Sequence, residues 1–369
     1  IMTQKHVTLD EIGRRIAIGS FNFDLAPVII VAFFTALLVM GTKIGARVDG
    51  ALTILKIAIV VFIVVVGFFY IKAENFTPFI PPSEPAASTD GSGVSAVMEQ
   101  PLWQWATGMA PSIYGVTGII SGAALVFFAF LGFDVVATAS EETINPKKNV
   151  PLGIGVGLGL IIVLYTLVAI VTTGMVSYKD LAKQSDPSLA VAFKMVGADW
   201  AAKIISLGIV IGMATVVMVL LLGLTRVVFA MSRDGLLPRG LSHTGKHGTP
   251  VRLQIIVGVV MALIAACCNV GILSDMVNIG TLSAFTLVAI SIPIMRKKRP
   301  DLERSFKIPG NPWVPILIAL ANLWLMVNLS VLTWIRFVVW LIVGFAIYFG
   351  YGYRHARLGA GELEVAAQE

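Results

Sequence analysis

Charged residues are scarce in this sequence: Asp, Glu, Lys and Arg make up only 13% of its 369 residues. Soluble domains carry about 25%. Hydrophobic residues make up 57%, and the mean hydropathy is +0.88. So few charges cannot cover a water-facing surface of this size. The composition therefore predicts a chain whose outer surface faces lipid and whose backbone hydrogen bonds are satisfied internally by helices.

Cysteine and histidine are also sparse, which disfavours chemistry that depends on them. The two cysteines, Cys267 and Cys268, are adjacent within an apolar stretch. Neighbouring side chains on a helix point in different directions, so we expect neither a disulfide nor a metal site there and interpret both as small core residues. The four histidines lie outside the apolar stretches: His6, His243, His247 and His355. We therefore expect no metal ion, no cofactor and no buried histidine relay.

Long apolar runs fill most of the sequence. A helix needs about 20 apolar residues to cross a bilayer core. Nine segments are candidates, at residues 25–41, 51–71, 118–138, 152–176, 201–230, 253–268, 276–295, 314–332 and 334–353. None is followed by a signal-peptide cleavage pattern. Gly153, Gly155, Gly157 and Gly159 in the fourth span predict close packing on more than one side of that helix.

Lysine and arginine are distributed unevenly between the loops, which predicts the orientation. They gather in alternate loops, at positions 43–47, 147–148, 226–252, 296–307 and 354–357. The long loop 72–111 has one lysine and four acids. We place the basic loops and the C-terminal tail 354–369 in the cytoplasm. The excess of 27 basic over 21 acidic residues then reflects topology, and we expect no nucleic-acid partner.

An odd number of spans places the two ends of the chain on opposite sides of the membrane. Residues 1–24 would then lie outside, before a membrane domain at 25–353. The sequence also begins with Ile1 instead of an initiator methionine. We take both observations to indicate that an odd number of spans is missing from the N-terminal side.

The third span contains the pattern that most favours a functional site. Residues 127–134 read FFAFLGFD, so Gly132 lies in mid-span among aromatic residues and close to Asp134. Ionisable residues within spans are rare and commonly functional, and Lys56 in the second span is another. Transporters use broken helices near the midplane as substrate sites. The alternative is an aromatic packing stripe with one glycine contact between helices.

Three long stretches carry a family resemblance. They are VFFAFLGFDVVATASEETINPKKNVP at 126–151, TRVVFAMSRDGLLP at 225–238 and NIGTLSAFTLVAISIPIMRKKRPDLERSFKIPGNPWVP at 278–315. In this order they resemble helices six, eight and ten of the amino acid–polyamine–organocation superfamily, and most of all the bacterial members of its cationic amino acid transporter family.

The resemblance implies an all-α, leucine-transporter-like bundle built on inverted repeats. The nine spans would match family helices four to twelve of twelve. The first family helix, which holds the substrate carboxylate, would be absent, so the chain alone is not expected to transport.

Site residues follow from the same resemblance. The unwound segment would be Phe128, Ala129, Phe130 and Leu131, whose carbonyls would accept hydrogen bonds from the α-ammonium group of the substrate. Phe128 would act as an aromatic gate, and Gly132 would permit the break.

Further residues would support or shape this site. Asp134 would be a charge partner or a structural cap just past the break. Glu141 and Glu142 would belong to a cytoplasmic gate, although a solvated charged loop explains them equally well. Leu220 would line the side-chain pocket.

Lys56 has two interpretations. It lies about six residues from the membrane edge, so its side chain could reach the cytoplasmic interface. The resemblance implies instead that its ammonium occupies the place where related transporters hold a sodium ion. Removal from water favours the neutral form of a lysine, so Lys56 would take up and release protons.

The resulting prediction is a secondary transporter for amino acids in the plasma membrane, proton-coupled and independent of sodium. Its partners would be the amino acid, protons and the lipid bilayer. An amino acid or polyamine exchanger and a non-transporting receptor remain alternatives. An enzyme is disfavoured, because Asp134 has no acid partner at its depth and no nucleophile–base set is visible. A channel is disfavoured because no repeated pore-lining pattern is present.

Overall fold

The computed structural model describes residues 7–9, 15–18, 21–40, 42–85, 97–109, 112–138, 143–184, 187–243, 250–268, 270–301, 304 and 307–356. Its apolar segments are helices, so the predicted all-α membrane fold is confirmed. Within these ranges, six stretches of helix are long and apolar enough to cross a membrane, and three apolar helices are shorter.

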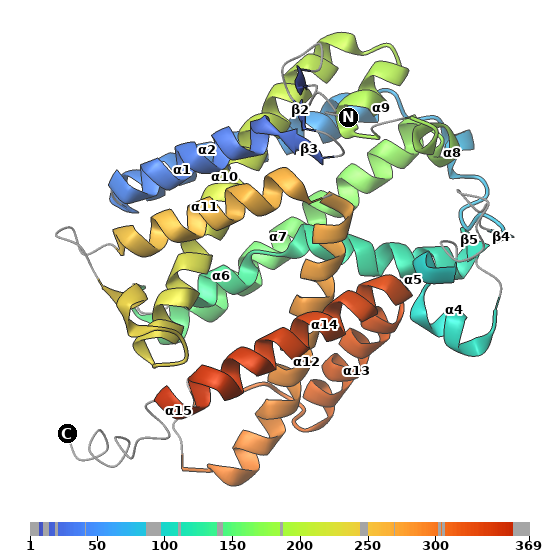
Figure 1. Cartoon of the computed structure of the whole chain (residues 1–369). Coiled ribbons are helices and arrows are strands. Elements are labelled where there is room, and N and C mark those ends of the chain that lie inside the picture. Colours follow the sequence, from blue (N-terminus) through green and yellow to red (C-terminus); the bar gives the residue numbers. More distant parts are fainter. Residues whose placement is uncertain are drawn as a thin grey trace, which may run out of the picture.

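The nine predicted spans each coincide with an apolar helix or helix pair (Figure 1). These elements are α1 (Leu25–Met40), α2 (Thr42–Phe68), α5 (Gly115–Val126) with α6 (Phe133–Thr138), α7 (Pro146–Met175), α10 (Asp199–Arg233), α11 (Val251–Cys267), α12 (Val270–Lys298), α13 (Trp313–Val327) and α14 (Val331–Ile347). Two differences from the predicted spans are clear. The third span is interrupted, and α12 begins earlier than residue 276, so that Asp275 lies inside the helix.

Short elements connect the apolar helices. They are the helical turns η1 (Ala73–Phe76), η2 (Phe127–Phe130), η4 (Arg239–Ser242) and η5 (Tyr348–Gly352), and the helices α4 (Leu102–Thr107), α8 (Tyr178–Ala182), α9 (Leu189–Met195) and α15 (Tyr353–His355). Three strands precede α1 and pair as an antiparallel meander: β1 (Val7–Leu9), β2 (Arg15–Ile18) and β3 (Phe21–Asp24). These strands were not among the predicted elements.

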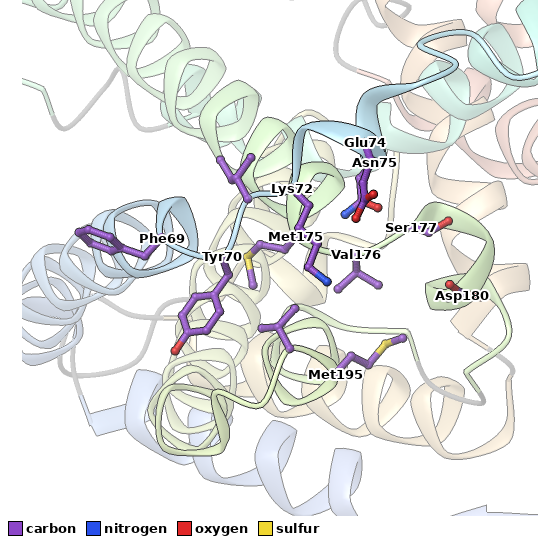
Figure 2. Close-up of a pocket in the computed structure, with 12 residues that line it drawn as sticks. Phe69, Tyr70, Lys72, Glu74, Asn75, Met175, Val176, Ser177, Asp180 and Met195 are labelled. Carbon is purple, nitrogen blue, oxygen red and sulfur yellow. The ribbon is translucent and has the colours of Figure 1, made fainter.

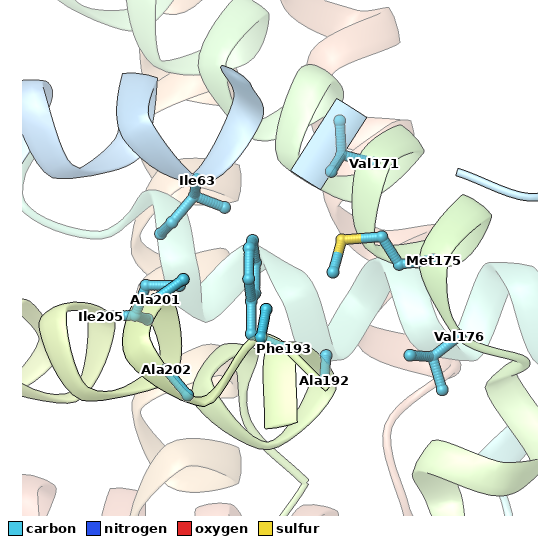
Figure 3. Close-up of a cluster of buried hydrophobic side chains, with 10 residues drawn as sticks. Ile63, Val171, Met175, Val176, Ala192, Phe193, Ala201, Ala202 and Ile205 are labelled. Carbon is cyan, nitrogen blue, oxygen red and sulfur yellow. The ribbon is translucent and has the colours of Figure 1, made fainter. Parts of the chain in front are cut away.

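Buried apolar side chains form separate clusters between helices. One cluster joins α2, α7, α9 and α10 around Phe193, which is fully buried against Ile63, Val171 and Ile205 (Figure 3). A second joins α1, α10 and α11, and a third joins α5, α12, α13 and α14. Many large apolar side chains outside these clusters are exposed, Ile54 and Phe69 among them. Such exposure is the expected surface of a chain that faces lipid.

Glycines bring α2 and α10 into close contact. A Cβ at Gly208 would lie 2.7 Å from Ile59, and one at Gly212 would lie 3.9 Å from the stem of Lys56. The two glycines are four residues apart, the spacing that allows membrane helices to approach closely. In contrast, a Cβ at Gly153, Gly155, Gly157 or Gly159 would meet no atom within 4 Å, so the predicted tight packing there is wrong.

The adjacent cysteines also differ from their prediction. Cys267 and Cys268 are exposed at the end of α11, so they are not core residues. Both thiols are free.

A hydrogen-bonded clasp holds the long loop before α5. Strand β4 (Glu84–Pro85) pairs antiparallel with β5 (Ser112–Ile113), which precedes α5 by two residues. The Lys179 ammonium on α8 donates a hydrogen bond of 2.6 Å to Glu84 and lies 5.8 Å from the centre of the Tyr114 ring. The hydrogen bond to Glu84 raises the pKa of Lys179 above its ordinary value. The clasp therefore links α8 to the start of α5.

Candidate functional site at the broken helix

The third apolar span is broken between Val126 and Phe133. Helix α5 ends at Val126, and a single 3-10 turn follows at Phe127–Phe130. Leu131 is then extended, with φ −63° and ψ 144°, and Gly132 has φ +117°. L side chains rarely adopt such a φ, so glycine is required here. The predicted interruption at Phe128–Gly132 is confirmed, whereas the substrate-binding roles of these residues stay predictions.

The break changes the hydrogen bonding of the backbone. The Leu131 amide donates to the Phe128 carbonyl (3.2 Å), and the Val135 amide donates to the Gly132 carbonyl (3.1 Å). In the part of the chain that the structure describes, the carbonyls of Phe130 and Leu131 have no hydrogen-bond donor. Buried or membrane-embedded carbonyls normally have one. These two are therefore available to an ammonium group.

Tyr165 supports the segment from α7, and sequence reasoning missed it. Its hydroxyl donates a 3.0 Å hydrogen bond to the Ala129 carbonyl, and its ring meets Phe130 edge-on at 5.2 Å between centroids. A tyrosine within an apolar span is a usable signal, because its hydroxyl needs a partner there. The sequence cannot say which helix supplies that partner.

Replacing Tyr165 with phenylalanine should therefore weaken the site while preserving the fold. The loss of one hydrogen bond costs about 0.5–1.5 kcal/mol. We expect substrate uptake by the full-length protein in liposomes to fall by roughly two- to tenfold. Thr166→Val is the control, because the Thr166 hydroxyl donates within α7 to Ile162. Equal losses in the two variants would show that Tyr165 has no particular role at the break.

One aromatic ring from α12, that of Phe285, packs beside the break. Phe285 lies between Phe127 and Phe133, with ring centroids 6.2 Å and 5.3 Å away. Phe128 lies outside this group and is 45% exposed, so its ring is free to meet a ligand. Phe285 thus contacts the broken segment on both sides of Phe128 in the sequence and leaves Phe128 itself partly exposed.

Asn278 is a second residue that sequence reasoning did not select. It is fully buried on α12, and its Nδ2 donates a 3.4 Å hydrogen bond to the Leu125 carbonyl, one residue before the end of α5. Its Oδ1 is buried without a partner among the described residues. A polar amide inside an apolar helix is costly, and this cost is the signal that could have identified Asn278.

Helix α10 passes the second half of the broken helix. A Cβ at Gly223 would lie 3.1 Å from the Val135 side chain on α6. Leu220 lies three residues before Gly223 on α10 and is 42% exposed. Residues three apart on a helix are neighbours on its surface, so Leu220 lies on the part of α10 that adjoins α6.

Lys56 packs on α10 one turn before Thr215. Its Cγ and Cδ atoms lie 3.9 Å and 4.0 Å from the position of a Cβ at Gly212. Thr215 is fully buried, and its hydroxyl donates to the Gly212 carbonyl at 2.9 Å. The Lys56 ammonium makes no hydrogen bond or ion pair with any described residue. The stem of Lys56 therefore lies against α10 near Gly212, and the role of Lys56 stays a prediction.

The acidic residues past the break are less well placed. The backbone of Asp134 belongs to α6, but its side chain lies outside the described residues, as do Glu141 and Glu142. Among the residues that are described, no three His, Cys, Asp or Glu side chains gather as a metal site would require.

A separate cavity of about 550 Å³ lies between the ends of α2 and α7 and the helices α8 and α9 (Figure 2). Its floor includes the buried Met175 and Val176, and Lys72 reaches in from the opposite side. The Lys72 amide and the Asn75 side chain both donate to the Gly174 carbonyl, at 2.9 Å and 2.8 Å. These bonds fix the loop to the end of α7. None of the residues predicted for the substrate site lines this cavity.

Comparison with known proteins supplies the family. The amino acid permease family matches residues 21–350. The chain is 40% identical over 342 residues to the branched-chain amino acid permease BcaP of Bacillus subtilis, covering 92% of this chain and 66% of that protein. It is also 40% identical over 337 residues to the methylthioribose transporter of the same organism, covering 91% of this chain and 66% of the relative.

A more distant relative is the mitochondrial cationic amino acid transporter 3 of Arabidopsis thaliana. It is 34% identical over 281 residues, which cover 76% of this chain and 42% of the relative. The chain thus spans just under two thirds of the length of the bacterial relatives. From the extent of the family match and the multi-pass helical fold, this chain belongs to the amino acid permease family of membrane transporters.

Proposed function

We propose that the protein carries amino acids across the plasma membrane by alternating access around the break at Phe127–Gly132. The observation that carries the proposal is this break, with two open carbonyls, in a member of a permease family. Irregular backbone at membrane depth is tolerated where it lines a cavity or a substrate site. An unbroken apolar helix would offer no such groups.

The α-ammonium group of the substrate would bind at the carbonyls of Phe130 and Leu131. An ammonium group has three donors and no acceptor, so two carbonyls without a donor fit its chemistry. Phe128, exposed beside them, would cover the bound amino acid. Tyr165 and Asn278 would hold the flanking backbone in place.

Proton movement would be coupled to transport through Lys56. The basic loops and the C-terminal tail would lie in the cytoplasm. A cation within a span costs at least about 2.5 kcal/mol, and the sequence retains it where α2 packs on Gly212. Protonation of Lys56 would then alternate with substrate binding, and sodium would have no part in the cycle.

The decisive experiment is uptake by the full-length protein in liposomes. A panel would contain alanine, leucine, arginine, a polyamine and methylthioribose, the last because a relative with 40% identity is named for it. Uptake of an amino acid into empty liposomes supports the proposal. Uptake that requires a preloaded amino acid indicates an exchanger, and binding without uptake indicates a receptor. Uptake of methylthioribose alone would overturn the amino acid assignment.

The side chain of Leu220 should limit substrate size. We expect the protein to prefer small or medium neutral amino acids, because a bulky leucine at this position would shorten the pocket for the substrate side chain. Leu220→Ser should raise arginine uptake relative to alanine by about tenfold, since one to two methylene groups of pocket space correspond to roughly 1–3 kcal/mol. Leu207→Ser, also exposed on α10 but about 20 Å away along the helix, is the control. Strong arginine uptake by the unaltered protein, unchanged in Leu220→Ser, would contradict the expectation.

A further inference from the structure

The end of α12 carries a run of cations: Arg296, Lys297, Lys298 and Arg299 are consecutive at the end of the helix. Lys297, Lys298 and Arg299 are exposed, as is Lys307 in the following loop. Two ordinary explanations exist for such a run, which are the topology of the membrane helix and the negative end of the helix dipole. The hydrogen bonds at the end of α12 show which of the basic side chains bind backbone carbonyls there.

Two arginines cap the helix end and fold the loop back on it. Arg304 donates to the carbonyl of Met295 in the last turn of α12 and to the carbonyls of Arg299 and Pro300 just after the helix. Arg296 donates to the Ile308 carbonyl at 3.1 Å. Arg304 therefore ties the segment after α12 to the end of the helix, and Arg296 fixes the return of the loop. The side chains of Lys297, Lys298, Arg299 and Lys307 take no part in these bonds, and we call these four residues the cation platform.

These remaining cations lack acidic partners in the described part of the chain. Lys297, Lys298, Arg299 and Lys307 form no ion pair there, and Asp301, the described acid nearest to them in sequence, forms none either. Four exposed positive charges and one described acid, Asp301, lie on about a dozen residues, so the segment carries an excess of positive charge that repels further cations and attracts anions. The platform therefore favours a negatively charged ligand.

An exposed tryptophan follows this platform in the sequence, at the start of the next helix. Trp313 begins α13, which packs on α12, and its ring is 72% exposed. The α12, α13 and α14 helices form one group in Figure 1. Tryptophan is enriched at the level of the lipid headgroups. A cation platform beside an exposed tryptophan thus lies where phosphate groups of lipids are found.

We propose that the end of the α12–α13 hairpin binds the headgroup of an anionic phospholipid, with Lys297 and Lys298 as its principal cations. Basic clusters next to the cytoplasmic end of a membrane helix attract anionic lipids by about fivefold in affinity for each cation. The lipid would hold this hairpin at a fixed depth in the bilayer. This assignment is independent of what the protein transports.

The test measures lipid retention by the purified full-length protein with native mass spectrometry. Phosphatidylglycerol and phosphatidylcholine are supplied in equal amounts, and the Lys297→Gln/Lys298→Gln double variant is compared with Lys147→Gln/Lys148→Gln, a consecutive exposed pair at the start of α7. The unaltered protein should retain phosphatidylglycerol preferentially. Loss of the Lys297 pair should weaken that retention by roughly 25-fold, and loss of the Lys147 pair should leave it unchanged.

Two further variants and outcomes complete the test. Lys297→Arg/Lys298→Arg should retain the lipid, which separates a charge effect from misfolding. Equal losses in the two glutamine variants would overturn the proposal in favour of non-specific surface charge. Equal retention of the two lipids by the unaltered protein would also overturn it. The measurement needs no transport, so a result that contradicts the lipid proposal leaves the proposed amino acid uptake untouched.

Discussion

Replacing Gly132 with alanine should strongly reduce transport while leaving the protein folded in the membrane. Gly132 has φ +117°, a conformation that alanine rarely adopts, and a Cβ there would meet no atom within 4 Å. The cost is therefore conformational and not a steric clash with neighbours. Backbone strain of this kind costs about 1–3 kcal/mol, enough to shift the segment towards a closed helix. Uptake should fall by roughly five- to hundredfold.

Gly122→Ala is a closely matched control for this experiment. Gly122 lies in α5, ten residues earlier, and a Cβ there would also meet no atom within 4 Å. It has no positive φ, so alanine should be neutral or slightly stabilising. Thermal unfolding of both variants in detergent checks that they fold. Wild-type uptake by Gly132→Ala would show that the break is not needed for transport.

Replacing Lys56 with methionine should remove proton-driven accumulation. Methionine keeps much of the apolar stem that packs against Gly212 but cannot carry a proton. If one proton moves with each substrate, a gradient of one pH unit concentrates the substrate about tenfold, because it supplies 1.36 kcal/mol. The Lys56→Met variant should therefore equilibrate substrate across the membrane without concentrating it.

The measurement compares liposomes with a pH gradient, with a sodium gradient and with neither. Lys203→Met is the control, since Lys203 is exposed on α10 and lines a cavity that does not include Lys56. It should accumulate substrate as the unaltered protein does. Accumulation driven by sodium, or full proton-driven accumulation by Lys56→Met, would mean that Lys56 is not the coupling residue.

Local sequence was enough to predict the break but not its supports. Gly132 among phenylalanines in mid-span indicates a break, because glycine adopts a positive φ without steric cost. The contacts that hold the break open depend on which helices meet. Tyr165 is 36 positions from Ala129, and Asn278 is 153 positions from Leu125. Neither pairing has a local signal in a single sequence.

Packing predictions from glycine patterns had mixed success for a related reason. The alternate glycines at 153–159 suggested crowding, yet each faces open space. The pair that does bring helices together, Gly208 and Gly212, has the four-residue spacing that keeps both on one face. Periodicity therefore identifies a packing face where it matches the helix repeat, and fails where it does not.

The clasp between Lys179 and Glu84 has a mechanical consequence for the break. Strand β5 ends two residues before α5, and a Cβ at Gly115, the first residue of α5, would lie 3.1 Å from Ser83. From there α5 runs twelve residues without interruption, which is about 18 Å at 1.5 Å per residue, and ends where the break begins. A displacement of α8 would thus act on the first turn of α5, and α5 would pass it to its other end, where the break with the open carbonyls begins.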